Sequence, residues 1–305
     1  MSGVGSSDPK PEFRAGGTDL SERRRSGVSK GPMVDLTASP DMVGVRWTSE
    51  GAARIGAMTN IASIAADTRI AGAYPGLAAA AAGLATPQVR NFATLGGNLA
   101  QRSRCWYYRN PQFDCLKKGG DSCPARAGNH LLGVTFDTNP CVAPHPSTLG
   151  AALLAYDATV ETNMRRVPVG PLLDGGAAGS ADNALVPGEI IASVELHPPL
   201  AGERALYKRA ISRAHAEWPL VEIVARAVIS DGLLRFVRIV AGGVAATPLR
   251  LSAVEAAAEG APATSATVNA AIERSADGAR LLPATAYKID LLKGLLRDLM
   301  ELLVH

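Results

Sequence analysis

Residues 94–98 read TLGGN, and a related stretch, AGGTDL, stands about eighty residues earlier at 15–20. Paired glycines lack Cβ atoms, so backbone N–H groups can turn inward and approach an anion, and a following Thr or Asn can add a hydrogen bond. The two stretches together indicate a two-sided grip on a pyrophosphate, although each Gly-Gly pair alone is more typical of a tight turn. Neither matches Gly-x-Gly-x-x-Gly or a P-loop, so neither a classical Rossmann site nor a nucleoside triphosphatase is supported.

The composition around these motifs is that of a folded protein with about two domains. The chain has 305 residues, of which 47% are apolar and 19% charged, and its mean hydropathy is +0.09. No apolar run reaches the roughly 20 residues that a bilayer span needs. The net charge is +3, from 31 basic and 28 acidic residues, which is too small a surplus to indicate nucleic-acid binding.

The first residues are polar and do not resemble an export signal. Residues 1–12 are rich in Ser, Gly and Pro and predict a mobile tail, and the triple arginine at 23–25 is followed by polar residues. We therefore expect no export signal in this chain and a cytoplasmic location. The alternative is a periplasmic location reached by co-export with a signal-bearing partner.

The four cysteines lie within 37 residues, with intervals of nine, seven and seventeen residues between them. This clustering indicates one local site. The spacing fits neither the Cys-x-x-Cys knuckles of structural zinc nor a bacterial ferredoxin run, while four thiolates still suit an iron–sulfur cluster. Zinc, and disulfides or free thiols, remain as alternatives. The cysteines are Cys105, Cys115, Cys123 and Cys141.

The surroundings of these cysteines favour an anionic cluster. Five cations against Asp114 give a local charge of +4, and four aromatic residues can exclude water. His145 follows between two prolines, where it is either a ligand contact or a hydrogen-bonded loop histidine. The cations are Arg102, Arg104, Arg109, Lys117 and Lys118, and the aromatic residues are Trp106, Tyr107, Tyr108 and Phe113.

Hydrophobic periodicity predicts mixed helices and antiparallel strands, which is an α+β fold. A hairpin is expected over 43–58, and a boundary at Pro198-Pro199. The apolar face of 287–303 is interpreted as core in preference to a cofactor or partner groove. Other helices are expected at 61–67, 77–84, 148–155, 252–259 and 266–275, and strands at 158–162, 165–169, 190–196, 206–211, 221–229 and 233–240.

Together these residues resemble the FAD-binding medium subunit of the molybdenum hydroxylases, the xanthine dehydrogenase and carbon monoxide dehydrogenase group. The resemblance implies a FAD-binding domain of two subdomains over 1–199, like that of the vanillyl-alcohol oxidase (PCMH) group, with an iron–sulfur excursion at 101–145. A small domain of antiparallel sheet and helices then covers 200–305. The segments that carry the resemblance are 15–20, 55–59, 89–99, 187–191 and 242–245.

The resemblance also implies cofactors and the residues that hold them. The cysteine excursion is similar to that of the branch with an extra [4Fe–4S] cluster, as in periplasmic aldehyde oxidoreductases and 4-hydroxybenzoyl-CoA reductases. Cys105, Cys115, Cys123 and Cys141 would ligate that cluster. Residues expected at FAD are Ala15, Gly16, Gly17, Thr18, Asp19, Leu20, Thr59, Thr94, Gly96, Gly97, Asn98, His145, Ser147, Ile191 and Lys208.

The implied function is electron transfer through FAD to an external acceptor. A large molybdopterin subunit would oxidise the substrate, a small [2Fe–2S] subunit would deliver the electrons, and this chain would hold no catalytic residue. The alternatives are a scaffold that keeps the cluster without FAD, or a stand-alone flavin oxidase. Two departures from the family weaken the expected FAD contacts: only fourteen residues precede Ala15, and Thr148 stands where an aspartate is usual.

Overall fold

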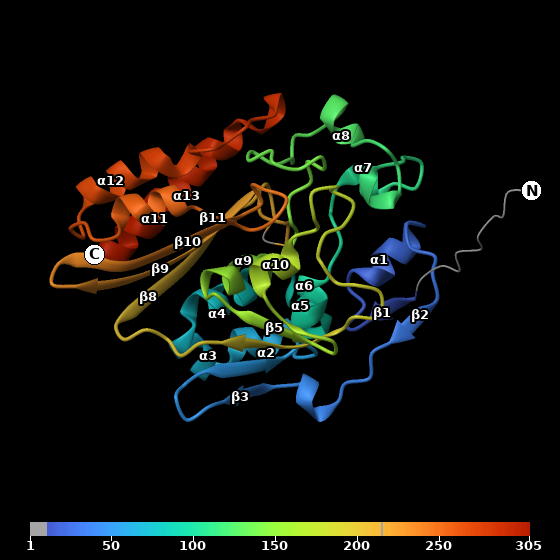
Figure 1. Cartoon of the computed structure of the whole chain (residues 1–305), viewed down its shortest axis with the longest axis horizontal. Helices are drawn as coiled ribbons and strands as arrows, with labels where there is room; N and C mark the ends of the chain where they lie inside the picture. Colours follow the sequence, from blue (N-terminus) through green and yellow to red (C-terminus); the bar gives the residue numbers. More distant parts are fainter. Residues whose placement is uncertain (1–10, 215) are drawn as a thin grey trace, which may run out of the picture.

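The computed structural model describes residues 11–214 and 216–305, which form the helices and strands shown in Figure 1. The strands are β1 (Glu12–Arg14), β2 (Met33–Asp35), β3 (Val45–Trp47), β4 (Ala53–Gly56), β5 (Thr159–Thr162), β6 (Arg166–Pro168), β7 (Ile191–Leu196), β8 (Glu203–Ala210), β9 (Val221–Ser230), β10 (Leu233–Gly242) and β11 (Leu249–Arg250). The α-helices are α1 (Leu20–Arg25), α2 (Ile61–Ala66), α3 (Thr68–Ala73), α4 (Pro75–Gly83), α5 (Pro87–Phe92), α6 (Leu95–Leu99), α7 (Trp106–Arg109), α8 (Pro124–Ala127), α9 (Thr148–Ala155), α10 (Val169–Leu173), α11 (Ser252–Ala258), α12 (Ser265–Glu273) and α13 (Tyr287–Val304). Short 3-10 helices lie at Pro40–Met42, Leu116–Lys118, Arg274–Ala276 and Pro283–Thr285.

The strands form three sheets. A five-stranded antiparallel sheet runs β3-β4-β7-β5-β6, a four-stranded antiparallel sheet runs β11-β10-β9-β8, and β1 pairs with β2 in parallel. In Figure 1, α11, α12 and α13 lie beside β8 to β11 at one end of the molecule, and α1, β1 and β2 lie at the other. The α+β fold class is confirmed.

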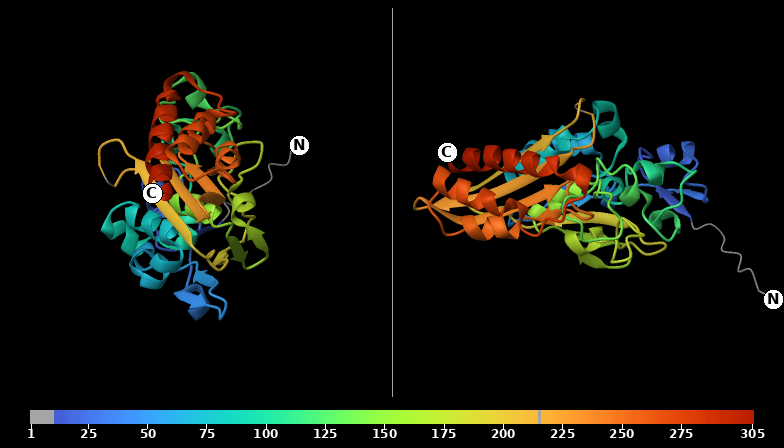
Figure 2. Two further views of the ribbon diagram at one scale, coloured as in Figure 1. Left: turned by 90° about the vertical axis from the view of Figure 1, so that its left-hand side faces the viewer. Right: turned by 90° about the horizontal axis from the view of Figure 1, so that it is seen from above.

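The four-stranded sheet is buried on both faces because the residues of β9 alternate between two cores. Val224 packs with the core that contains α4 and α9, whereas Ile223 and Ala225 pack with the core of α11 and α13. Figure 2 shows α13 lying along this sheet. The sheet therefore separates α4 and α9 from the C-terminal helices α11 and α13, so polar groups on its α9 side lie deep in the molecule.

Several predicted elements form for the expected local reasons. Helix α9 has the predicted bounds, and its N-cap Ser147 accepts a hydrogen bond from the N–H of Gly150. The alanine-rich α4 packs closely, since a Cβ on Gly76 would lie 3.1 Å from a methyl carbon of Val224. In α13 the leucines at 292, 296, 299 and 303 are buried as predicted, but Leu302 is 51% exposed and does not belong to that face.

The sequence analysis missed the shortest elements and the β1–β2 pair. A mobile tail was predicted at 1–12, of which residues 1–10 lie outside the described residues. Glu12 instead begins β1, where it is paired with Met33 of β2. Helices α1, α3, α5, α6, α7, α8 and α10 have four to six residues each, too few for a periodic pattern. Within the described ranges, no helix is both long enough and apolar enough to cross a membrane.

Candidate functional site: a glycine cradle beside a cysteine excursion

The first Gly-Gly motif follows β1 and turns the chain into α1. Gly17 has φ of +73°, which is the left-handed region that glycine tolerates. A Cβ on Gly16 would lie 1.7 Å from the carbonyl oxygen of Phe92, just before the second motif. The two motifs therefore pack directly against each other, and we call residues 15–20 and 94–98 together the glycine cradle.

The second motif is a short helix and not a turn. Thr94 caps α6, and its Oγ1 accepts the N–H of Gly97 at 3.2 Å. The N–H groups at 95, 96 and 98 donate to backbone carbonyls. All four N–H groups donate hydrogen bonds within the protein. An anion could therefore come close to this motif but would find no free backbone donor there. The prediction that both motifs turn free N–H groups inward is therefore wrong for residues 95–98.

The first motif keeps its donors. The N–H groups of Gly16, Gly17 and Thr18 donate to no oxygen atom of the described residues. Consecutive unpaired N–H groups beside a left-handed residue form a concave donor set that suits an anion. The two motifs therefore have different roles. Residues 16–18 supply donors, whereas Gly96 and Gly97 let α6 pack closely, since Cβ atoms there would lie 2.9 Å from Ala57 Cβ and 3.0 Å from the Thr94 hydroxyl, respectively.

Two clefts meet at the cradle. The first, of about 230 Å³, lies between the two motifs, and the second, of about 340 Å³, shares Thr18, Asp19, Gly97 and Gln101 with it. Residues of the glycine cradle line both clefts, and we call the two clefts together the cradle cavity. Predicted residues lining the first cleft are Ala15, Gly16, Gly17, Thr18, Asp19, Leu20, Thr94, Gly96, Gly97 and Ile191, and Asn98 lines the second.

The cysteine excursion, residues 101–145, lies next to this cavity with all four thiols free. Cys123 accepts a hydrogen bond from Cys141, which lowers the pKa of Cys123 and raises that of Cys141. Cys105 interacts electrostatically with Cys123 and Cys115, so the four thiols share one neighbourhood. Among the described residues, no three His, Cys, Asp or Glu side chains are arranged to hold a metal ion.

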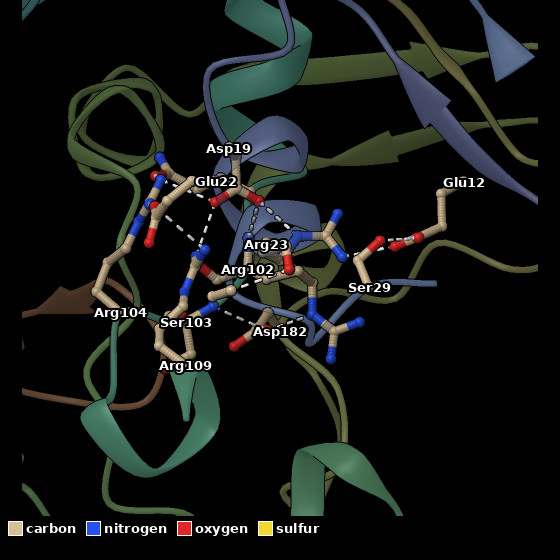
Figure 3. Close-up of polar contacts among 12 residues, drawn as sticks. Glu12, Asp19, Glu22, Arg23, Ser29, Arg102, Ser103, Arg104, Arg109 and Asp182 are labelled. Carbon is tan, nitrogen blue, oxygen red and sulfur yellow. Dashed lines mark hydrogen bonds and ion pairs between the residues drawn. The ribbon is translucent and has the colours of Figure 1, made fainter. Parts of the chain in front are cut away.

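Acidic residues outside the excursion neutralise its cations (Figure 3). Asp19 Oδ1 pairs with Arg109 at 2.7 Å and Arg104 at 2.9 Å, and its Oδ2 accepts the N–H of Arg102. Asp182 pairs with both Arg102 and Lys117 at 2.6 Å.

The surplus of +4 counted from the sequence is therefore largely compensated by these acids. Lys118 is the exception, since its Nζ donates to the carbonyls of Tyr107 and Asn110. The arginines of the excursion bind it to the cradle.

Comparison with known families decides the class of protein. The model described as "FAD binding domain in molybdopterin dehydrogenase" matches residues 3–199, and that described as "CO dehydrogenase flavoprotein C-terminal domain" matches residues 205–302. The chain belongs to the FAD-binding medium subunits of the molybdenum hydroxylases. The resemblance seen in the sequence is confirmed at this level.

Similar proteins include other flavin subunits. The aldehyde oxidoreductase FAD-binding subunit PaoB of Escherichia coli (strain K12) is 32% identical over 256 residues, which are 81% of this chain and 79% of that protein. The xanthine dehydrogenase FAD-binding subunit of Escherichia coli O157:H7 is 33% identical over 93 residues, 30% of this chain and 32% of that protein.

Solved structures share the fold of this medium subunit. Carbon monoxide dehydrogenase from Hydrogenophaga pseudoflava superposes with a TM-score of 0.74 at 22% identity, covering 97% of this chain and 89% of that one. Quinoline 2-oxidoreductase from Pseudomonas putida 86 gives 0.73 at 18% identity, covering 97% and 90%. Identities this low show likeness of fold alone.

Four residues expected at the cofactor do not line the two clefts of the medium subunit. Thr59 Oγ1 accepts the N–H of Gly44, and Ser147 Oγ donates to Asn98 at 2.7 Å. The Nζ of Lys208 pairs with Asp298 of α13 at 2.9 Å. Ser147 acts on the cavity through Asn98, whereas the structure directs Thr59 and Lys208 to other partners.

The fourth residue, His145, is buried and lines a third cavity of about 120 Å³, which shares Arg104, Pro146, Trp218 and Pro219 with the second cleft. Its Nε2 lies 3.0 Å from the carbonyl of Asp182, and burial lowers the pKa of its imidazole to about 4. The ring is therefore neutral near pH 7. Glu222 and Lys288 line the same cavity, and sequence analysis missed both, since a charged residue within an apolar strand or at a helix start carries no signal of burial.

Proposed function

We propose that this medium subunit carries FAD in the cradle cavity and transfers electrons within a molybdenum-dependent aldehyde oxidoreductase. The glycine cradle, with its free donors at residues 16–18, carries the proposal. The 32% identity to an aldehyde oxidoreductase flavin subunit supports the choice of aldehyde as substrate class. FAD would supply a carrier that accepts two electrons and releases them one at a time or together.

The residues of the cavity fit FAD. The N–H groups of Gly16, Gly17 and Thr18 would hold the diphosphate, and Gly97 lines the same cleft, where a Cβ would lie 3.0 Å from the Thr94 hydroxyl. Residues 19, 20, 94, 96, 98 and 191 would line the rest of the cofactor. Fixed backbone donors suit a diphosphate because they need no reorientation on binding.

We propose in addition that Cys105, Cys115, Cys123 and Cys141 ligate one [4Fe–4S] cluster. The chemistry of the donor set supports it, because four free thiols gather in one excursion. The excursion has only short helices, so metal ligation would supply order that regular structure does not. The cluster would provide a one-electron carrier.

Partner subunits complete the proposed assembly. Substrate oxidation would occur on a large molybdopterin subunit, and a small [2Fe–2S] subunit would deliver electrons, in a heterotrimer or its dimer. The division into a flavin domain at 1–199 and a C-terminal domain at 200–305 is part of the same proposal, and the two hydrophobic cores support it.

Cofactor analysis of the purified chain tests the proposal. We expect one non-covalent FAD and about four irons per chain. FAD without iron would favour a stand-alone flavin oxidase, and iron without FAD would favour a scaffold subunit. Near-stoichiometric zinc, or two disulfides without iron after anaerobic preparation, would refute the cluster.

Gly97→Val tests the cradle, because Gly97 lines the first cleft and a Cβ there would lie 3.0 Å from the Thr94 hydroxyl, so a branched side chain would displace the residues that border the proposed phosphate site. We expect the FAD content to fall below a tenth of the unmodified level. Gly72→Val is the matched control, since no atom lies within 4 Å of its Cβ position in α3. Full flavin occupancy in Gly97→Val would show that the diphosphate binds elsewhere.

A further inference from the structure

Asp19 stands where the glycine cradle meets the cysteine excursion. It follows Thr18, the last of the three free donors, and caps α1 at its N-terminus without a side-chain hydrogen bond to the backbone of that helix. Its carboxylate is turned instead toward arginines, as Figure 3 shows. Both oxygens are engaged by protein groups, so Asp19 acts on any bound ligand through the loop that it anchors.

Three of the groups that hold Asp19 belong to the excursion. The side chains of Arg104 and Arg109 pair with Oδ1 at 2.9 and 2.7 Å, and the backbone N–H of Arg102 donates to Oδ2 at 3.1 Å. Arg23 of α1 completes the set at 3.1 Å. The side chain of Asp19 is only 13% exposed, so these contacts are shielded from solvent.

The same arginines surround Cys105 in the sequence. Arg104 precedes it directly, and Arg109 ends the single-turn helix α7 that begins at the next residue. Arg109 also donates to the carbonyls of Arg102 and Ser103 at 2.8 Å, which closes the chain around the cysteine. Whatever fixes Cys105 in place therefore fixes the guanidinium groups that hold Asp19.

Glu22, one turn further along α1, repeats the connection more weakly. Its Oε2 pairs with Arg104 at 2.5 Å and Arg109 at 3.3 Å, and its side chain is 39% exposed. The excursion thus grips α1 at two successive positions. On its other side, Asp182 ties Arg102 to Lys117, which lies two residues after Cys115.

We propose that Asp19 couples the cysteine excursion to the glycine cradle, so that metal ligation by the cysteines tightens FAD binding and FAD binding tightens metal retention. The inference rests on the proposed function. Without ligation, ordering the backbone of the excursion costs entropy that no metal bond offsets, and its arginines are no longer held on Asp19. The donors at residues 16–18 are then less preorganised for the diphosphate. Linkage requires the effect to be reciprocal.

The test measures the dissociation constant of FAD by flavin fluorescence on the full chain, before and after anaerobic removal of iron with a chelator. In the unmodified chain we expect removal of iron to raise the constant about 5-fold or more, the lower end of typical coupling between sites. In Asp19→Asn, which retains the size of the side chain but not its charge, we expect the constants with and without iron to differ less than 2-fold. An Asp19 with a merely structural role would weaken FAD binding equally in both states and leave the ratio unchanged.

Two further variants keep the test decisive. Glu22→Gln removes only the more exposed connection and should lower the ratio partway, so it serves if Asp19→Asn does not fold. Asp41→Asn is the control, because the Asp41 carboxylate pairs with Arg46 at 2.6 Å, far from the excursion in sequence, and is 71% exposed; this variant should retain the full ratio.

The outcomes separate the two proposals. A ratio near one in an unmodified chain that binds both FAD and iron would overturn the coupling alone, as would a full ratio in both Asp19→Asn and Glu22→Gln. Absence of FAD or of iron from the unmodified chain would refute the proposed function and the coupling with it.

Discussion

The cysteine excursion and the four-stranded sheet each depend on a buried carboxyl group, and the two groups have opposite electrostatic environments. Asp182 is 6% exposed and lies against Arg102 and Lys117 of the excursion. Glu222, on β9, is 2% exposed and accepts a hydrogen bond from Tyr207 at 2.9 Å. The first has two cations in contact, whereas the second is held by hydroxyl groups.

The pKa values follow from this difference. Burial alone would raise the pKa of Asp182, but the charges of Lys117 and Arg102 outweigh it and hold the pKa below its usual range. Burial raises the pKa of Glu222 to about 7, against hydrogen bonds from Tyr207 and Thr148. Two similarly buried carboxyl groups therefore have pKa values shifted in opposite directions, and the neighbouring charges decide the direction of each shift. The excursion is held together by charge, and the sheet carries a carboxyl that is easily protonated.

Removing the Asp182 charge should have the largest effect on stability. Asp182→Asn leaves Lys117, only 7% exposed, without its counter-charge, and breaking one partner of a buried pair costs about 3–5 kcal/mol. We expect that loss in the free energy of unfolding, measured by urea titration at pH 7. The folded-state pKa of Asp182 lies below its ordinary 3.8, so its contribution is complete above that pH and is lost as the pH falls through the folded value.

Asp137, which lies in the cysteine excursion, provides a matched control for Asp182. Asp137 pairs with Arg126, whose side chain is 38% exposed, so Asp137→Asn should cost about 1 kcal/mol or less. Equal losses in the two variants would show that burial does not distinguish the two pairs, and the comparison with Glu222 would fail.

Glu222→Gln should change the pH dependence of stability by a smaller amount. The folded chain binds the Glu222 proton up to about pH 7, whereas the unfolded chain releases it near 4.5, so the free energy of unfolding falls as the pH rises between those values. Two and a half pKa units correspond to about 3 kcal/mol as an upper value. We expect Glu222→Gln to lose this decline between pH 4.5 and 8 in urea titrations.

The exposed Glu259→Gln serves as its control and should follow the unmodified chain. An unchanged pH profile in Glu222→Gln would mean that Glu222 is already ionised in the folded state, and the contrast with Asp182 would disappear.

Lys208→Met should have the smallest effect. Lys208 lies on β8, beside Tyr207, but its pair with Asp298 is exposed, with side chains 38% and 58% accessible. Exposed pairs contribute about 0.2–1 kcal/mol, so we expect a change below 1 kcal/mol in the same urea assay. A loss above 2 kcal/mol in the free energy of unfolding would mean that the Lys208 pair contributes as much as a buried ion pair. The flavin affinity of this variant also tests the sequence prediction that Lys208 lies near the isoalloxazine ring.

Elements defined by neighbours in the sequence were predicted closely. The strands predicted at 221–229 and 233–240 form β9 and β10, and the Asp231-Gly232 turn between them has positive φ at both residues, 54° and 72°, as such a hairpin turn requires. Helix α9 was predicted with the bounds that the structure shows, 148–155. By contrast, β1 and β2 have three residues each and pair in parallel across an intervening helix, which no local pattern reports.

The sequence by itself determined the family, the glycine motifs and the grouping of four cysteines, because these depend on residue type and short spacing. Only the tertiary structure decided how the parts work together. It places the free donors in residues 16–18 and not in α6, and it pairs Asp19 with arginines more than eighty residues away. It also lowers the pKa of Asp182 and raises that of Glu222. The physical reason is that a hydrogen-bond partner, a counter-charge and the exclusion of water are each supplied by distant segments. Their effect on a side chain exists only once the chain has folded around it.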